Sequence, residues 1–351
     1  WTEIEIGSGT ASFSVSSGKA VINLGGSFDS GLSQSFTTVV GKTYSVSYDL
    51  AFTTNFNYSN RLDWGVGTSL NSTNIAAQIT TSAGTPSLTF IATGTTAYIN
   101  IRSGSGANTT GVYTLDNISV RIAESDRSVN AKGLQTFGTV TKTAVATGAE
   151  LVGYSGWSAS NYLAQPYNSD LDFGTGDFSY MGWIKWVSGT GYLFDRADTS
   201  GNRRISVYPN SNGAVTFYTE NGYQTSAAST LLANVWTHLT VVRRSGVIYG
   251  YHNGVQIITG LADTGSKTSA DGSALLKAGV RFNNANALNG SIALLRASAT
   301  LPSAEQIKKM YNDEKHLFQE NAKATLYGTS DAVTALAYDD DTELLHVGTS
   351  A

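Results

Sequence analysis

Side chains suited to binding a sugar gather in one short stretch of the chain. Between residues 52 and 64 aromatic rings alternate with polar groups, and the candidates are Phe56, Tyr58, Arg61, Asp63 and Trp64. Aromatic faces stack on the apolar faces of sugar rings, while neighbouring polar groups hydrogen-bond to hydroxyls. The stretch therefore predicts a carbohydrate-binding surface. The alternative is that part of these rings fill the core of a β-sandwich.

A second set of such residues lies in the middle of the chain. Its members are Arg203, Tyr208, Tyr218 and Tyr223, with the loop acids Asp195 and Asp198. The arginine and tyrosines fall in predicted strands joined by Asn and Gly turns, which should bring them to one rim. Because ligand sites are usually built on such loops and rims, we predict a second carbohydrate-binding surface here.

Residues for catalysis are missing from the sequence pattern. The four histidines form no pair at metal-ligand spacing, and they are His238, His252, His316 and His346. Glycosidases need two carboxylates ~5–9 Å apart, and only Glu3 and Glu5 imitate that spacing on one strand. The sequence has no Gly-x-Ser-x-Gly elbow and no phosphate loop. We therefore predict that the chain is not an enzyme.

Composition limits the fold class and the partners. The chain has 351 residues, 37 glycines, 4 prolines and 14% charged residues, which is typical of many short strands joined by polar turns. A net charge of −4 argues against nucleic acid as a partner. Zero cysteines exclude disulfides, and no apolar run is long enough for membrane insertion. These properties predict a mainly β protein with two tandem β-sandwich (jelly-roll) domains.

The stretch 168–186 is predicted to organise the second domain. Leu171 and Phe173 should end one strand before a turn at residues 174–176, and Phe178 and Tyr180 should begin the next. Trp183 is too large for an open sheet, so we expect a second sheet to cover it.

Three motifs in order resemble the laminin G-like, concanavalin A-like lectin fold over residues 133–320. They are the stretch 168–186, the hairpin pair 234–242 and 247–255, and the closing strand 289–296 with the helix that follows it. The resemblance implies glycan binding rather than cleavage. It also implies calcium near the sugar, which makes Asp195 and Asp198 candidate ligands, although the sequence offers no second acid opposite Asp195.

Residues 1–123 are similar to jelly-roll carbohydrate-binding modules. The segments that carry the similarity are 34–36, 39–50 and 113–120. The resemblance implies that Asp116 joins Glu3 or Glu5 and backbone carbonyls around a structural Ca²⁺ ion. Because a calcium ion needs several oxygen ligands, a solvated acid at the end of a strand is the alternative for Asp116.

The remaining segments are a linker, a helix and a terminal β segment. We expect the linker at 124–132 and the closing helix at 303–320, with Ser303 as its cap and Gln306 at the capping-box position. Residues 321–351 are predicted to form a short strand and a terminal β-hairpin, similar to one blade of a propeller. One blade cannot bury its own faces, so it should pair with a neighbouring subunit or with other sequence.

Together these features predict a non-catalytic surface-recognition protein. The tandem modules and the closing segment resemble bacteriophage tail fibre or virion appendage proteins, which implies a virion-surface or extracellular location. The expected partners are cell-surface polysaccharide or glycan, further copies of the chain, for example in a trimer, and other virion or filament proteins. The alternatives are a structural spacer or decoration module without ligand, and an accessory binding part of a polysaccharide-degrading enzyme.

Overall fold

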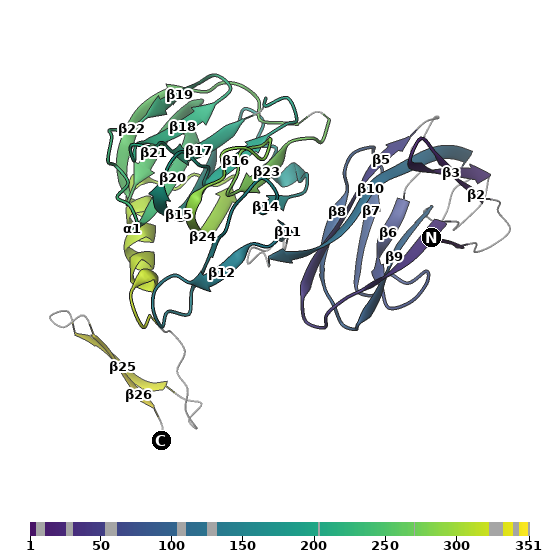
Figure 1. Ribbon diagram of the computed structural model, residues 1–351, viewed down its shortest axis with the longest axis horizontal. Helices are drawn as coiled ribbons and strands as arrows, with labels where there is room; N and C mark the ends of the chain where they lie inside the picture. The colour runs from purple at the N-terminus through teal and green to yellow at the C-terminus, as the bar shows by residue number, and fades with distance from the viewer. Residues whose placement is uncertain are drawn as a thin grey trace.

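The computed structural model describes residues 1–4, 11–25, 31–52, 62–103, 110–124, 132–202, 204–269, 271–322, 333–339 and 344–349 (Figure 1). It is mainly β, with two tandem sandwiches, a C-terminal helix and a terminal hairpin. The predicted fold class is therefore confirmed.

The first sandwich consists of one five-stranded sheet and a facing layer of strands that belongs to a larger sheet. Its strands are β1 (Thr2–Ile4), β2 (Ala11–Ser16), β3 (Lys19–Gly25), β4 (Gly31–Thr37), β5 (Thr43–Phe52), β6 (Leu62–Gly67), β7 (Ala76–Thr80), β8 (Ser87–Ile91), β9 (Thr96–Ser103) and β10 (Thr110–Glu124). The five-stranded sheet has the order β1-β4-β9-β6-β7, and β2, β3, β10, β5 and β8 form the facing layer. Alternation along β5 points Val46, Tyr48 and Leu50 into the core between them.

The second sandwich contains the other long strands and the helix. Its elements are β11 (Leu134–Phe137), β12 (Thr141–Ala144), β13 (Val152–Ser155), β14 (Tyr162–Gln165), η1 (Ser169–Leu171), β15 (Phe178–Ser188), β16 (Phe194–Ala197), β17 (Ile205–Pro209), β18 (Val215–Thr219), β19 (Gly222–Thr225), β20 (Trp236–Arg244), β21 (Val247–His252), β22 (Val255–Ala262), β23 (Leu275–Ala278), β24 (Asn289–Ser298), α1 (Ala304–Glu314) and η2 (Lys315–Phe318). One layer has the order β19-β18-β17-β16-β23-β14-β11, and we call it the ladder sheet after a row of side chains on its outer face. The facing layer has the order β12-β13-β24-β15-β20-β21-β22, and we call it the helix sheet because α1 packs on its outer face.

Aromatic rings from both layers fill the core of the second sandwich. Tyr180 of β15 stacks on Phe194 of β16 with ring centroids 4.7 Å apart, and both rings are buried. Phe217 lies so close to the backbone of β21 that a Cβ at position 250 would come within 2.6 Å of its ring. The close approach of the layers at this point therefore requires Gly250.

Trp183 faces away from this core, so the prediction that a second sheet covers it is wrong. Its ring lies on the outer face of the helix sheet, 4.2 Å from the Phe318 ring centroid and 5.7 Å from that of Tyr311. Its Nε1 donates a hydrogen bond of 2.7 Å to Glu314. Strand alternation fixes that Trp183 and Tyr180 point to opposite faces, and here α1 and η2 cover the second face.

The segment before β15 is also different from the prediction. Residues 169–171 form the 3₁₀ helix η1 in place of a strand. The Asn168 side chain accepts a hydrogen bond from the Asp170 backbone N–H at 3.0 Å, which caps this turn. The tight turn at 174–176 is present, with Gly174 at φ +55°.

The closing helix begins as predicted. The Ser303 Oγ accepts a hydrogen bond from the Gln306 N–H at 3.2 Å, and Gln306 Oε1 accepts one from the Ser303 N–H at 2.7 Å. This capping box is confirmed. Helix α1 ends at Glu314 and η2 continues to Phe318, slightly short of the predicted end. Among the described residues, no helix has the length and apolarity needed to span a membrane.

One sheet runs through both sandwiches. The last residues of β10 pair with β11, with Ala123 opposite Gln135 and Glu124 opposite Leu134. Gln135 Nε2 also donates to the hydroxyls of Ser45 and Ser47, both at 3.3 Å, where these serines are buried. Glu124 and Lys132 are the described residues of the predicted linker, and 125–131 lie outside the described residues.

The terminal hairpin consists of β25 (Val333–Asp339) and β26 (Leu344–Thr349), as predicted. The predicted short strand before it falls in 323–332, outside the described residues. Tyr338 and Leu345 are opposite each other and are 59% and 60% exposed. Figure 1 shows the hairpin apart from both sandwiches.

Candidate functional site

The first predicted carbohydrate surface is described only in part. Phe56, Tyr58 and Arg61 lie outside the described residues. Trp64 is 0% exposed, packs edge-on against Tyr48 at 4.8 Å, and donates from Nε1 to a hydroxyl of β7 at 3.1 Å. For Trp64 the core alternative therefore holds, since both ring faces are covered. Asp63 is half-buried on the same strand.

The second predicted surface lies on the outer face of the ladder sheet. In β17, Ile205 and Val207 point into the core, so Arg204, Ser206 and Tyr208 point outward. Arg203 lies outside the described residues. The outward position next to β17 is therefore taken by Arg204, which was not among the predicted site residues.

Two tyrosines from adjacent strands stack on this face. Tyr218 of β18 is directly opposite Tyr223 of β19, and their rings lie 6.3 Å apart at an interplanar angle of 10°. Tyr223 is 63% exposed and Tyr218 is half-buried. Tyr208 lies on the same face and packs against Tyr192 at 4.6 Å. The structure thus brings the three predicted tyrosines to one surface.

Arginine side chains extend this stack. The Arg204 guanidinium lies 4.4 Å from the Tyr218 ring centroid and 5.4 Å from that of Phe282, and the Arg281 guanidinium lies 5.1 Å from the same Phe282 ring. Rings and guanidinium groups therefore alternate across the face of the sheet. We call this set the aromatic–arginine ladder, and it consists of Tyr223, Tyr218, Arg204, Phe282 and Arg281.

A buried ion pair fixes the centre of the ladder. The Arg204 Nε and Nη2 donate to the two Asp195 oxygens, each at 3.0 Å, and the Phe282 N–H also donates to Asp195 at 3.0 Å. Burial raises the pKa of Asp195, and the Arg204 hydrogen bonds act against that rise. Asp195 is 0% exposed. In this structure it positions Arg204 and Phe282, and calcium binding by Asp195 stays a prediction.

The other predicted metal ligands also have protein partners. Asp198 Oδ1 accepts from the N–H groups of Ser200 and Asn202 at 2.9 and 2.8 Å, which closes the turn before β17. Asp116 accepts from the Asn117 N–H at 2.8 Å and lies 3.7 Å from the Lys19 ammonium. Glu3 is exposed in β1, and Glu5 lies outside the described residues. In the part of the chain that the structure describes, no three acidic or histidine side chains cluster around a possible metal position.

Two ladder residues were missed by the sequence reasoning. Phe282 and Arg281 come from the loop between β23 and β24, far along the chain from Arg204. Lys277 holds this loop, since its Nζ donates to the Phe282 carbonyl at 2.6 Å and to Asn284 Oδ1 at 2.7 Å. The adjacent Arg281 and Phe282 in an Asn-rich loop are the local sequence signal that could have identified this loop as part of a binding surface.

A buried ionic network, the loop-edge network, supports one edge of the ladder. Lys267 Nζ donates to Asp263 and Glu220, both at 2.8 Å, and Glu220 lies in the turn between β18 and β19. In that turn, Asn221 also donates to Asp263 at 2.8 Å. This turn joins the strands that carry Tyr218 and Tyr223. The network therefore fixes the backbone beneath the exposed end of the ladder.

Arginines close the rest of the loop-edge network. Arg243 donates to the carbonyl oxygens of Gly174 and Gly265 at 2.7 and 2.9 Å, and it lies 3.4 Å from Asp263. Arg196 pairs with Asp172 at 2.5 Å. The buried cations are thus Arg196, Arg243 and Lys267. Their three positive charges balance the three negative charges of Asp172, Asp263 and Glu220.

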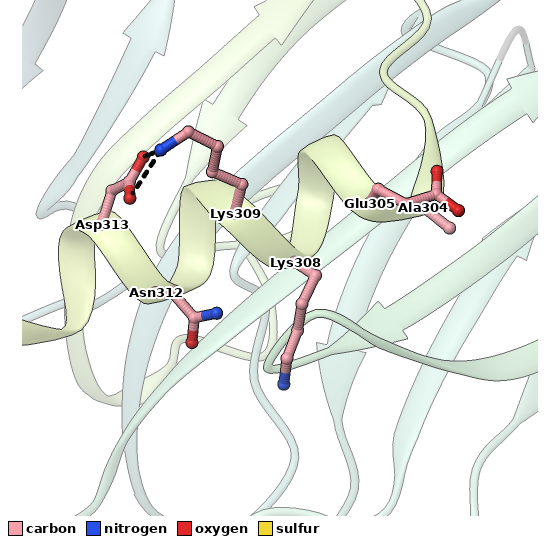
Figure 2. A pocket seen from close by; sticks show the side chains of 6 residues that line it. All are labelled: Ala304, Glu305, Lys308, Lys309, Asn312 and Asp313. Carbon is pink, nitrogen blue, oxygen red and sulfur yellow. Dashed lines mark hydrogen bonds and ion pairs between the residues drawn. The ribbon is translucent and has the colours of Figure 1, made fainter.

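Hollows elsewhere on the surface do not border the ladder. Figure 2 shows one on the solvent face of α1, where all the lining residues come from the same helix and Lys309 pairs with Asp313 at 2.8 Å. A groove of about 330 Å³ lies between α1 and strands β15 and β24, and it contains Met181, Met310 and Arg296. Neither hollow is lined by a ladder residue.

Comparison with known proteins gives one family match. Residues 157–308 match the model of the concanavalin A-like lectin/glucanases superfamily. No curated protein gives a significant match.

Several solved structures resemble the chain at low identity. Domain 4 of AbnA, a GH43 extracellular arabinanase from Geobacillus stearothermophilus in complex with arabinotriose, is 19% identical, with a TM-score of 0.39 over 50% of this chain and 82% of that one. The binding domain of Paraclostridial Mosquitocidal Protein 1 is 12% identical, with a TM-score of 0.42 over 64% and 61%. The receptor binding domain of botulinum neurotoxin mosaic serotype C/D is 13% identical, with a TM-score of 0.40 over 55% and 50%. The similarity to laminin G-like, concanavalin A-like domains thus covers residues 157–308, which is less than half of the chain.

Proposed function

We propose that the chain is a non-catalytic carbohydrate-binding protein whose aromatic–arginine ladder contacts sugar. The observation that carries this proposal is the parallel Tyr218–Tyr223 pair, with Tyr223 exposed and its outer ring face open to a ligand. Rigid aromatic rings on a sheet supply contact area to a ligand with little loss of side-chain entropy.

The polar groups of the ladder complement these rings. Arg204 is held by Asp195 and by the Tyr192 hydroxyl at 3.0 Å, so its position is fixed before a ligand arrives. Such preorganisation reduces the ordering cost of binding. A sugar on Tyr223 would therefore meet a rigid surface in which the buried Arg204 supports the Tyr218 ring and the half-buried Arg281 supplies hydrogen bonds.

We infer further that this binding serves recognition of cell-surface polysaccharide by a virion appendage such as a bacteriophage tail fibre. The order of modules supports it, since two sandwiches precede a hairpin with exposed apolar side chains at Tyr338 and Leu345. An isolated two-stranded hairpin is marginal by itself, which favours pairing with other copies of the chain. Native mass spectrometry tests this assembly, and a strictly monomeric chain would contradict it.

The decisive experiment compares Tyr223→Ala and Tyr218→Ala with the wild-type chain. We expect each substitution to weaken glycan binding by ~1–3 kcal/mol, because each removes one aromatic contact. The measurement is a glycan array followed by calorimetric titration of the strongest ligand. Val255→Ala is the control, since Val255 is 57% exposed and lies in β22, outside both the ladder and the hairpin.

Three results would separate the alternatives. Loss of binding in the two ladder variants but not in Val255→Ala supports the proposal. Unchanged binding in folded ladder variants would move the site elsewhere. If the wild-type chain binds neither the array nor bacterial cells, the spacer alternative is correct.

A further inference from the structure

The end of the ladder opposite to Tyr223 is the Arg281 guanidinium, whose charge acts to lower the pKa of Asp195. Arg281 stacks on Phe282 at 5.1 Å, but none of the ion pairs between described residues involves it. Its Nε is buried and has no hydrogen-bond partner among the described residues. Because this Nε is buried, a ligand acceptor would meet the other N–H groups of the guanidinium, which belongs to a half-buried side chain.

The backbone around Arg281 is nevertheless fixed. Its N–H donates to the Ala285 carbonyl at 2.9 Å, and its own carbonyl accepts from the Asn284 N–H at 2.8 Å. Lys277 holds the same loop through the Phe282 carbonyl and Asn284. The arginine is therefore presented from an ordered loop, which is the arrangement expected of a recognition residue.

The charge around the ladder is positive although the whole chain carries −4. The cations are Arg204, Arg281 and Lys277, and the nearby carboxylates are Asp195 and Asp198. Asp195 is fully engaged by Arg204 and the Phe282 N–H, and one oxygen of Asp198 accepts two backbone N–H groups. The local excess of cations therefore favours an anionic ligand.

We propose that the ladder binds an acidic glycan, with Arg281 contacting an anionic oxygen group on the sugar. This rests on the proposed function and narrows it to a ligand class. Tyr223 and Tyr218 stack on sugar rings at one end, and Arg281 makes a charge-assisted hydrogen bond to a carboxylate or sulfate at the other. Guanidinium suits this contact because its planar fork matches both groups.

The experiment uses matched pairs of polysaccharides. Polygalacturonate, alginate and hyaluronan are compared with their carboxyl-reduced forms, and heparin with its desulfated form, by biolayer interferometry on the full chain. We expect at least one acidic polymer to bind and its neutralised form to bind at least tenfold more weakly. The binding should also weaken as NaCl concentration rises. The polymer pair that responds identifies the group as carboxylate or sulfate.

Variants then assign the effect to one residue. Arg281→Gln should lose about tenfold to a hundredfold in affinity for the acidic form, as expected for a hydrogen bond to a charged group. Its affinity for the neutralised form should not change. Arg281→Lys should retain part of the affinity because it keeps the positive charge. It should not retain all of it, because an ammonium group cannot make the two parallel hydrogen bonds of a guanidinium. Lys309→Gln is the charge-matched control, since Lys309 is an exposed residue of α1 that pairs with Asp313 (Figure 2) and lies outside the ladder.

The outcomes distinguish this inference from the proposed function. If glycans bind but the neutralised forms bind as well as the acidic ones, the acidic class is wrong and carbohydrate binding stands. The same holds if Arg281→Gln and Lys309→Gln weaken acidic binding equally. If no polymer of the panel and no sugar of a glycan array binds, the proposed function itself fails.

Discussion

At the residue scale, His238 is a buried side chain whose protonated form is disfavoured in the folded protein. Its ring lies 5.3 Å from that of Trp183 beneath α1, and neither ring nitrogen has a hydrogen-bond partner among the described residues. Burial, with a smaller contribution from the nearby Arg296, lowers the pKa of His238 to about 4. The neutral imidazole is therefore the form compatible with the native packing.

This burial predicts a stability change with pH. Above about pH 6.5 His238 is neutral in both states. As the pH falls from 6.5 to 4, the unfolded chain takes up a proton that the folded chain does not, and the free energy of unfolding decreases by roughly 2–3 kcal/mol. His238→Leu should remove this contribution and be at least as stable at pH 7, because it leaves no unpaired nitrogen. Urea unfolding of both proteins between pH 4 and 7 measures the difference, and a difference independent of pH would contradict it.

At the element scale, the loop-edge network decides where the β18–β19 turn lies. Lys267→Met leaves Asp263 and Glu220 without their shared cation in a buried site. We expect a loss of about 3–5 kcal/mol in the free energy of unfolding. Lys309→Met, which breaks an exposed pair within α1, should cost no more than about 0.5 kcal/mol. Chemical denaturation of both variants is the measurement, and equal losses would show that the network contributes little.

The elements also show what could be predicted from the sequence. The start of α1 was predictable because its signal is local, with Ser303 and Gln306 three residues apart. The packing of α1 and η2 on Trp183 was not predictable. The alternation of side chains along β15 shows that the strand has two buried faces, but not which face packs on a sheet and which on a helix. The ladder was half predictable, since the tyrosine strands are local. Phe282 reaches Asp195 from 87 residues away, and only the tertiary fold brings them together.

At the scale of the whole molecule, the sheet shared by β10 and β11 couples the two sandwiches. Gln135 connects them through buried hydrogen bonds to Ser45 and Ser47. Glu124 adds contacts to Tyr154 at 2.8 Å and to Lys142 at 2.5 Å. Backbone pairing thus joins β10 to β11, and side-chain contacts join β11 to β5 and β10 to β12 and β13. The sandwiches should therefore behave as one body rather than as units on a free tether.

This coupling predicts a single thermal transition for the wild-type chain. Gln135→Ala removes both hydrogen bonds and leaves two buried hydroxyls unpaired, at a cost of about 1–3 kcal/mol of coupling. We expect the unfolding of the two sandwiches to separate into distinct transitions by calorimetry. Gln256→Ala, at an exposed position of β22, should keep the single transition. A wild-type chain that already unfolds in two steps would refute the coupling.

The ladder and α1 lie on opposite outer faces of the second sandwich. If each copy of the chain were attached to a larger assembly through the residues that follow α1, the ladder of each copy would face away from that assembly. Several copies in one assembly would then meet a repetitive polysaccharide at the same time. Each later contact would form at the high effective concentration set by the first, so modest single-site affinity would become strong avidity. A weak monomeric affinity for sugar is thus compatible with firm attachment of an assembly.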